Sequence, residues 1–308
     1  MLPSGDHRGI AATLPKRRRI AGPKAEVREL GTPNMSSLAP SRTSDTVNTT
    51  ATRRTGFWSQ SHHLDRMTLK ELVFAYLQYP AIILYLGLAA VAIGVWFYDP
   101  APIGGSLLAI AVAVLLFPVV WYVLHRWVLH SRWMWKVSFL AATWKRIHYD
   151  HHQDPNHLEV LFGSPMNVVP TVAFSTIPVG YLIAGPGGAA AAFATGMIQT
   201  CINEFFHCIQ HLAYKPKNKW LLHMKQRHME HHFHDETGNF GITNFWWDHL
   251  GRTYYPGASS RKKSPTVFNL GYTDEVAEAY PRVRDLSGGV IATAEFRQRN
   301  KGALDRAA

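Results

Sequence analysis

The strongest constraint in this sequence is the absence of charge from three long apolar stretches. No Asp, Glu, Lys or Arg occurs in residues 72–98, 100–124 or 160–203. A helix needs roughly 20 apolar residues to cross the ~30 Å hydrocarbon core of a bilayer. The first two stretches suffice for one crossing each, and the third suffices for two. A buried helix of a soluble protein would explain one such stretch, but not several separated by polar turns.

The third stretch is interrupted by the turn sequence Gly185-Pro186-Gly187-Gly188. We therefore predict four transmembrane helices in two hairpins, with one span on either side of this turn. Proline and glycine within the last two spans are tolerated where neighbouring helices bond the freed backbone groups. The predicted spans are residues 79–98, 103–124, 168–184 and 189–206.

The loops between these spans differ in charge. The turns at 99–102 and 185–188 contain no Lys or Arg, whereas basic residues precede the first span and follow the second and fourth. The positive-inside rule then places the basic side and both termini in the cytoplasm. The formal net charge is +11. We assign it to the membrane surface and expect no nucleic-acid partner, because the basic residues flank apolar stretches.

The chain divides into three regions by composition. Residues 1–70 are basic and hold few large apolar side chains up to about residue 56, so we expect a mostly disordered amino-terminal tail. Residues 71–258 contain the apolar stretches and the histidine clusters, and form the predicted membrane domain. Residues 259–308 are expected to be a polar carboxy-terminal tail.

Ten histidines follow the predicted membrane exits in four motifs, HX4H, HX2HH, HX3H and HX2HH. Positions i, i+3 and i+4 share a helix face, so HX2HH and HX3H direct their rings to one side. HX4H places its two rings about 140° apart on an ideal helix, so we expect that pair to straddle a helix end or bend. The ten residues are His125, His130, His148, His151, His152, His207, His211, His228, His231 and His232.

These ten imidazoles predict a metal site. Imidazole is a good ligand for Fe, Zn, Cu and Ni. One ion binds about four to six ligands, so ten rings fit two ions better than one. A single histidine near an interface is more often a surface residue, but four clusters on one side are difficult to explain in that way. The expected fold class is an all-α integral membrane protein with a cytoplasmic His-rich helical cap that holds a dinuclear metal site.

The position of the clusters separates two kinds of function. A membrane metal carrier would need ligands near mid-bilayer, whereas the first three spans contain no histidine. A site at the mouth of a helix bundle instead suits a lipid, whose acyl chain stays in hydrocarbon while one carbon reaches the metals.

Two acidic residues could accept hydrogen bonds from the ligands, since metal-bound imidazole usually donates its other N–H to a carboxylate or carbonyl. They are Glu204, three residues before His207, and Asp248, after an aromatic run.

At these residues the sequence resembles the membrane fatty acid hydroxylase superfamily, which includes sterol desaturases and carotenoid hydroxylases. The resemblance covers about residues 120–255 and is greatest to fatty acid 2-hydroxylases, whose ten-histidine pattern matches this one position by position. The stretch HMKQRHMEHHFHDETGNFGITNFWWDHLGRTY at 223–255 is also similar. Its NFG (239–241) and WDHLG (247–251) elements recur across the superfamily.

The resemblance implies an O₂-dependent di-iron monooxygenase that hydroxylates a lipid acyl chain, with the ten histidines as ligands. It also implies iron as the native metal, with zinc as an alternative in isolated protein. Residues 1–70 lack the His-Pro-Gly-Gly-type motif of a fused haem domain, so we expect a separate electron donor, a ferredoxin or cytochrome with its reductase. The alternatives are a desaturase or a sterol or carotenoid hydroxylase with the same metal site, and a membrane metal carrier or sensor.

Overall fold

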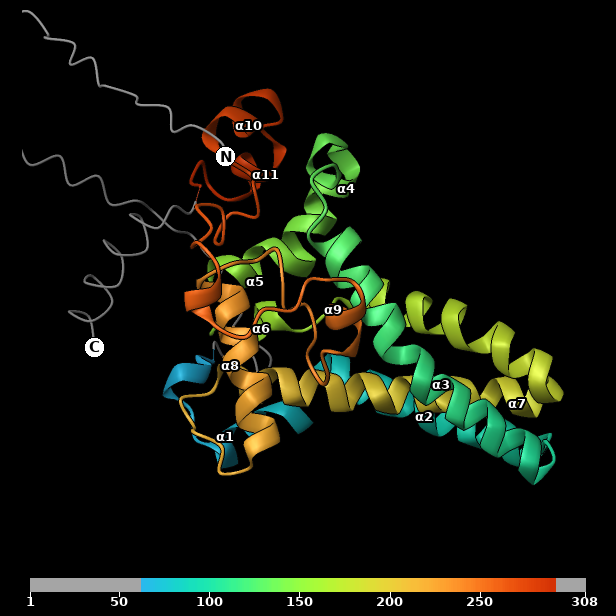
Figure 1. Ribbon diagram of the computed structural model, residues 1–308. Helices are drawn as coiled ribbons and strands as arrows, with labels where there is room; N and C mark the ends of the chain where they lie inside the picture. Colours follow the sequence, from blue (N-terminus) through green and yellow to red (C-terminus); the bar gives the residue numbers. More distant parts are fainter. Residues whose placement is uncertain (1–61, 292–308) are drawn as a thin grey trace, which may run out of the picture. The chain divides into compact units, whose positions relative to one another are not determined.

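The computed structural model describes residues 62–291, which fold into helices joined by loops (Figure 1). Within this range the structure contains no β-strand beyond an isolated bridge between His63 and His157. Most of the predicted amino-terminal tail and the last part of the carboxy-terminal tail lie outside the described residues. The elements are η1 Leu64–Arg66, α1 Leu69–Leu77, α2 Pro80–Tyr98, α3 Ile103–Val123, the π-helix η2 Leu124–Leu129, η3 Met134–Lys136, α4 Ser138–Trp144, the π-helix η4 Lys145–Tyr149, α5 Asp150–Gln153, α6 Leu158–Leu161, α7 Pro165–His211, α8 Lys219–Phe233, α9 Trp246–Leu250, η5 Ala258–Ser260, α10 Asp274–Ala279 and α11 Arg282–Leu286.

Three helical regions in the described part of the chain are long and apolar enough to cross a membrane. They are Pro80–Tyr98, Ile103–Leu129 and Leu158–His211. Apolar side chains on α3 and α7 remain exposed, with Leu115 72% and Leu182 85% accessible, and a lipid phase would cover them. These features identify the chain as a membrane protein.

The third region is bent within α7. Ala184 and Gly185 leave the helical conformation, and Gly185 has φ of +60°, which glycine adopts without the steric cost that a Cβ would bring. Figure 1 shows the two arms of α7 running back alongside each other. Their backbones approach so closely that a Cβ on Gly180 would overlap the carbonyl oxygen of Gly188. The predicted turn at 185–188 is thus present and begins one residue earlier.

The helices extend further than the predicted spans. α7 begins at Pro165 rather than residue 168 and ends at His211 rather than residue 206. On the other side of the bundle, α3 continues as the π-helix η2 to Leu129. Apolar composition marks only the part of a helix that lies in hydrocarbon, whereas the backbone hydrogen bonds of the same helix can continue into polar sequence. The extensions carry His125, His207 and His211 beyond the apolar segments.

Both α2 and α3 pack along α7. Beside the histidines, buried side chains from α1, α2, α6 and α7 form the largest apolar cluster, including Tyr76, Tyr85 and Met197. The Tyr85 hydroxyl donates a hydrogen bond to the Gly163 carbonyl at 3.1 Å, so this packing also fixes the loop that leads into α7.

A second apolar cluster joins residues 259–291, part of the predicted polar tail, to the segment around α4. Trp135 and Trp144 pack there with Tyr272 and Val283, all of them buried. The Trp144 indole N–H donates to the Leu129 carbonyl at 2.8 Å. A few well-spaced apolar residues therefore attach this polar segment to the end of η2, beside the histidine clusters.

Candidate metal centre

The HX4H motif lies at the end of α3, where the helix changes type. The N–H of His130 donates to the carbonyl of His125 at 3.1 Å, the i to i+5 bond of a π-helix. This wider turn brings residue i+5 back towards residue i, and the two ring centroids lie 5.0 Å apart. The bend that we expected between these histidines thus takes the form of a π-helical turn.

The structure brings all ten predicted histidines together. Within each of three groups, one ligand atom per residue lies within 4.8 Å of the others. The first group is His151, His207, His211, His228 and His232; the second is His125, His130, His148 and His231; the third is His152 with His231 and His232. The third group shares members with the other two, so the ten rings form one continuous assembly with two main centres.

Each HX2HH motif contributes to both main groups. On α8, His228 and His232 belong to the five-histidine group, while His231 belongs to the four-histidine group. Positions i+3 and i+4 lie on either side of position i when viewed down a helix, about 100° apart. One helical turn can therefore supply rings to two neighbouring ions. The three rings of an HX2HH motif thus divide between two groups, whereas we expected them to point to one side.

The distances between ring nitrogens fit metal coordination. The Nε2 atoms of His125 and His148 lie 3.2 Å apart, those of His130 and His148 2.8 Å, and those of His211 and His228 2.9 Å. Two nitrogens bound at right angles to one ion, each at about 2.1 Å, would lie about 3 Å from one another. The rings are thus spaced as neighbouring ligands of shared ions.

The five-histidine group also has unused bonding capacity. Among the described residues, neither ring nitrogen of His151, His207 or His232 has a hydrogen-bond partner, and all are buried. A buried polar atom without a partner costs about 1–3 kcal/mol. A metal ion accepts the lone pairs of such nitrogens, so the residues present fit a bound transition metal.

Burial keeps these imidazoles neutral, which is the form that binds metal. Loss of solvation lowers the pKa of His231 to about 4. Loss of solvation and the neighbouring rings hold the pKa values of His148, His151, His228 and His232 well below the usual range. The folded protein therefore presents unprotonated nitrogen donors at neutral pH.

Backbone carbonyls orient three of the rings. The Nδ1–H groups of His125, His231 and His152 donate to the carbonyls of Phe240, Gly238 and Val267, at 2.6, 2.7 and 3.0 Å. Since a carbonyl only accepts, each Nδ1 must carry the proton. This tautomer leaves Nε2 of each ring free of hydrogen and able to coordinate a metal.

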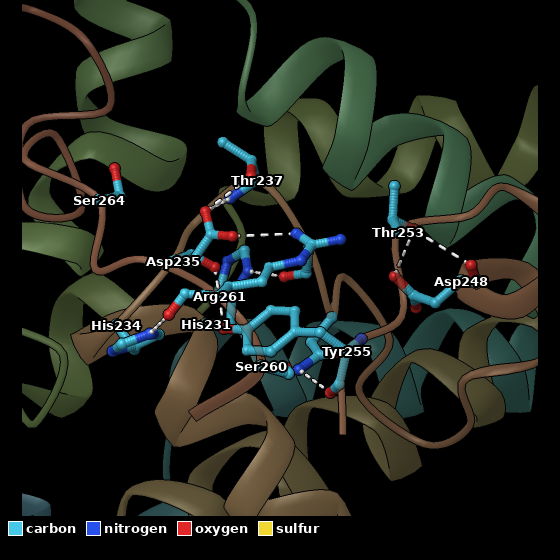
Figure 2. Close-up of polar contacts among 12 residues, drawn as sticks. His231, His234, Asp235, Thr237, Asp248, Thr253, Tyr255, Ser260, Arg261 and Ser264 are labelled. Carbon is cyan, nitrogen blue, oxygen red and sulfur yellow. Dashed lines mark hydrogen bonds and ion pairs between the residues drawn. The ribbon is translucent and has the colours of Figure 1, made fainter. Parts of the chain in front are cut away.

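Asp248 supports this arrangement indirectly. Its buried carboxylate accepts hydrogen bonds from the N–H groups of Phe240 at 2.8 Å and Gly241 at 2.9 Å, and from the Thr253 hydroxyl at 2.7 Å. Burial raises the pKa of Asp248, while these hydrogen bonds act in the opposite direction. Figure 2 shows Thr253 beside the carboxylate. Asp248 therefore fixes the loop whose Phe240 carbonyl orients His125.

Glu204 is buried on α7, one turn before His207. One carboxylate oxygen lies 3.5 Å from the N–H of Gly163, which donates to it. Within the described residues, no hydrogen bond joins Glu204 to a histidine. Its expected role beside the ligands stays a prediction.

Sequence reasoning missed the residues that shape the loop after α8. Asn239 has φ of +55°, and its side chain forms two hydrogen bonds with the backbone of Tyr255, at 3.1 and 3.0 Å. Asp235 pairs with Arg261 at 2.9 Å and accepts from the Thr237 hydroxyl at 2.6 Å (Figure 2). The Gly238-Asn239 pair is a turn signal, but it does not reveal which carbonyls will meet the histidines.

An apolar cavity of about 390 Å³ leads to the histidines. Its wall comes mainly from α3, the segment around α4 and the first arm of α7, including Leu116, Val120 and Thr171. Four histidines from both main groups complete it: His125, His148, His151 and His207. Met166, which is 83% exposed, also lines the cavity, so the cavity reaches the surface of the molecule. The cavity thus connects the apolar part of the molecule with the candidate metal centre.

The sequence is similar to known fatty acyl 2-hydroxylases. Fatty acid 2-hydroxylase of Rattus norvegicus is 27% identical over 149 residues, which cover 48% of this chain and 40% of the relative. Dihydroceramide fatty acyl 2-hydroxylase FAH1 of Arabidopsis thaliana is 31% identical over 147 residues, 46% of this chain and 58% of the relative. The matched part of this chain therefore spans 40% and 58% of the length of these two relatives.

A solved structure of full-length scs7p, in which only the hydroxylase domain is visible, superposes with a TM-score of 0.48 at 21% identity, over 68% of this chain and 73% of that one. The fatty acid hydroxylase family model matches residues 110–253, a range that includes all ten histidines and Asp248. The resemblance seen in the motifs is confirmed, because residues 110–253 of this chain match the fatty acid hydroxylase family model.

Proposed function

We propose that the protein is an O₂-dependent membrane monooxygenase that hydroxylates the acyl chain of a lipid, in the manner of a fatty acid 2-hydroxylase. The cavity carries this proposal, because an apolar channel of about 390 Å³ ends at four of the ten histidines. This volume lies within the usual range of small-molecule sites, about 300–1,000 Å³. An acyl chain is the substrate that such a wall would hold, with one carbon against the histidines.

The ten histidines are the proposed ligands of two ions, with the five-histidine and four-histidine groups at the two centres. Imidazole alone does not choose among Fe, Zn, Cu and Ni, so the choice of iron rests on the family. When bound, a pair of iron ions would supply the activation of O₂ for attack on an unactivated C–H bond, which side chains alone do not provide.

The chain's own residues would position the reaction. Leu116, Val120 and Val172 line the cavity and would exclude water from the acyl chain. The carbonyls of Gly238 and Phe240 hold His231 and His125 in the tautomer that presents Nε2. Asp248 keeps that loop in place through the N–H groups of Phe240 and Gly241.

The membrane arrangement that we propose has four passes, with each arm of α7 crossing the bilayer, and residues 71–258 as the catalytic domain. In this arrangement the histidine clusters and both termini lie in the cytoplasm, an orientation that the positive-inside rule supports. Electrons would come from a separate ferredoxin or cytochrome with its reductase.

The test is product analysis under ¹⁸O₂. Membranes from an expressing host should accumulate hydroxylated acyl chains that carry one ¹⁸O atom, found by mass spectrometry of the hydrolysed lipids. His151→Ala should abolish this product and leave the protein inserted in the membrane. His223→Ala provides a control, because His223 lies on α8 but outside the three histidine groups.

Two results would contradict the proposal. An unlabelled hydroxyl group would mean that the oxygen does not come from O₂, and an iron-loaded, reduced protein that forms no product would remove the proposed activity. Products with a new double bond, or with an oxidised sterol or carotenoid ring, would instead identify one of the alternative reactions of the same centre.

A further inference from the structure

A second depression reaches the histidines, apart from the apolar cavity. It encloses about 210 Å³ and is lined by Arg126, Trp127, His130, Arg132, Glu236, Thr237, Phe240 and Leu270. It shares no lining residue with the cavity described above. The two openings therefore approach the histidine assembly through different walls.

His130 is the one histidine that lines this depression, and it differs from the other nine histidines of the assembly. Those nine are all buried, with at most 5% of each residue accessible, whereas His130 is only partly buried. Its Nε2 lies 2.8 Å from Nε2 of His148, so the same ring that reaches the depression also belongs to the four-histidine group. His130 thus connects the protein surface with the centre of the site.

The rim of the depression combines positive charge with an exposed aromatic ring. Arg132 is exposed, and the Arg126 guanidinium lies 4.9 Å from the centre of the Trp127 ring, which is 54% accessible. The single acidic residue of the lining, Glu236, accepts a hydrogen bond from the Thr266 hydroxyl at 2.5 Å. Arginine and tryptophan are enriched at protein interfaces, and a net positive rim favours an acidic surface.

We infer that this depression is the docking site of an acidic one-electron carrier protein, and that His130 is the point at which electrons enter the site. The inference rests on the proposed function. Hydroxylation of R–H to R–OH uses O₂, two electrons and two protons, and also releases water. Each product therefore requires two carrier molecules, each oxidised by one electron. Docking over this depression puts the carrier beside one proposed ligand, while the substrate occupies the other opening.

The first test measures binding, which does not depend on catalysis. Full-length protein in nanodiscs is titrated with an acidic [2Fe–2S] ferredoxin at low and at physiological ionic strength. Arg132→Glu should raise the dissociation constant roughly fivefold or more and weaken its salt dependence, because it reverses a charge on the rim. Lys217→Glu is the matched control: Lys217 is exposed and does not line the depression, so its dissociation constant should stay within about twofold of wild type.

The second test separates docking from the chemistry. The iron-loaded protein is reduced without oxygen, either by the ferredoxin or by dithionite, and is then exposed to O₂ for a single turnover. The ratio of ferredoxin-driven to dithionite-driven product should fall at least fivefold in Arg132→Glu and stay unchanged in Lys217→Glu. If the wild type forms no product with dithionite, the proposed function is contradicted. If dithionite does drive product formation but the ratio is the same in Arg132→Glu as in the wild type, only the docking site is contradicted.

Two binding results would overturn the inference. The first is that the ferredoxin does not bind the wild type, or that it binds Arg132→Glu with the same dissociation constant as the wild type. The other is a lipid effect: if Arg132→Glu lowers the retention of anionic lipid by the purified protein but leaves ferredoxin affinity unchanged, the depression is a lipid site and not a protein dock.

Discussion

The Nε2 atoms of His130 and His148 lie only 2.8 Å apart. Two bare ring nitrogens would repel each other at this distance, so a proton or a cation must lie between them or beside them. Burial and the neighbouring rings hold the pKa of both residues well below the usual range, which disfavours a charged ring. A neutral Nε2–H···Nε2 hydrogen bond would satisfy this pair. A metal ion shared by the two rings would also satisfy it, and its binding energy would then become part of the stability of the fold.

Metal removal should therefore destabilise the protein. We expect purified protein to hold two transition-metal ions per chain, measured by elemental analysis. Stripping them with a chelator should lower the free energy of unfolding by about 2.7 kcal/mol or more, the value for a site saturated at 100 times its dissociation constant. Re-addition of Fe²⁺ should restore the thermal midpoint. Fewer than two ions per chain, or an unchanged midpoint after stripping, would argue against the dinuclear centre.

Substitutions within the two main groups should reduce the metal content separately. His211→Ala removes a proposed ligand of the five-histidine group, and His231→Ala removes a proposed ligand of the four-histidine group. Each should bring the metal content towards one ion per chain and abolish hydroxylated product. His223→Ala, on the same helix as His231, should keep both ions. A variant of either group that retains two tightly bound ions would show that its ring is not a ligand.

Asp248→Asn should loosen the loop that orients His125. Asparagine keeps one accepting oxygen and replaces the other with an NH₂ group, so it cannot accept all of the hydrogen bonds that the carboxylate receives from Phe240, Gly241 and Thr253. One buried donor then loses its partner, at a cost of about 1–3 kcal/mol, and metal affinity should fall about 10- to 100-fold. Metal titration and thermal unfolding measure these two effects. Asp274→Asn, at an exposed position, should change neither.

A bulky residue in the cavity should block the substrate and spare the metals. Thr171 lines the cavity, so Thr171→Trp should reduce product at least tenfold, while the metal content stays at the wild-type level. Phe174→Trp is the matched control, because Phe174 lies on the same arm of α7 and is 82% exposed. This variant should form as much product as the wild type. If Thr171→Trp kept full product formation, the acyl chain would have to bind elsewhere.

Much of the fold could be predicted from local sequence properties. Charge-free stretches of sufficient length predict helices that cross a membrane, and α2 and α3 begin within one residue of the expected positions. Gly185 marks the reversal of α7, because the turn needs a positive φ there. The spacing of the histidines also predicted which residues gather, since the helical repeat fixes how rings three and four positions apart are directed.

The sequence could not show how the rings divide between two groups. His228 and His231 are three residues apart on one regular helix, yet they belong to different groups, because His211 meets one and His125 meets the other from distant helices. It also could not show that the Gly238, Phe240 and Val267 carbonyls orient the ligands, since every residue has a carbonyl and only the path of the chain determines which one lies beside a ring.

Sequence alone thus determined the apolar helices, the identity of the clustered histidines and the resemblance to fatty acid hydroxylases. Only the tertiary structure decided the π-helical turn between His125 and His130, the indirect role of Asp248 and the apolar cavity. The reason is physical: hydrophobicity and helical periodicity act over a few residues, whereas the shape of a site depends on contacts between segments far apart in the chain.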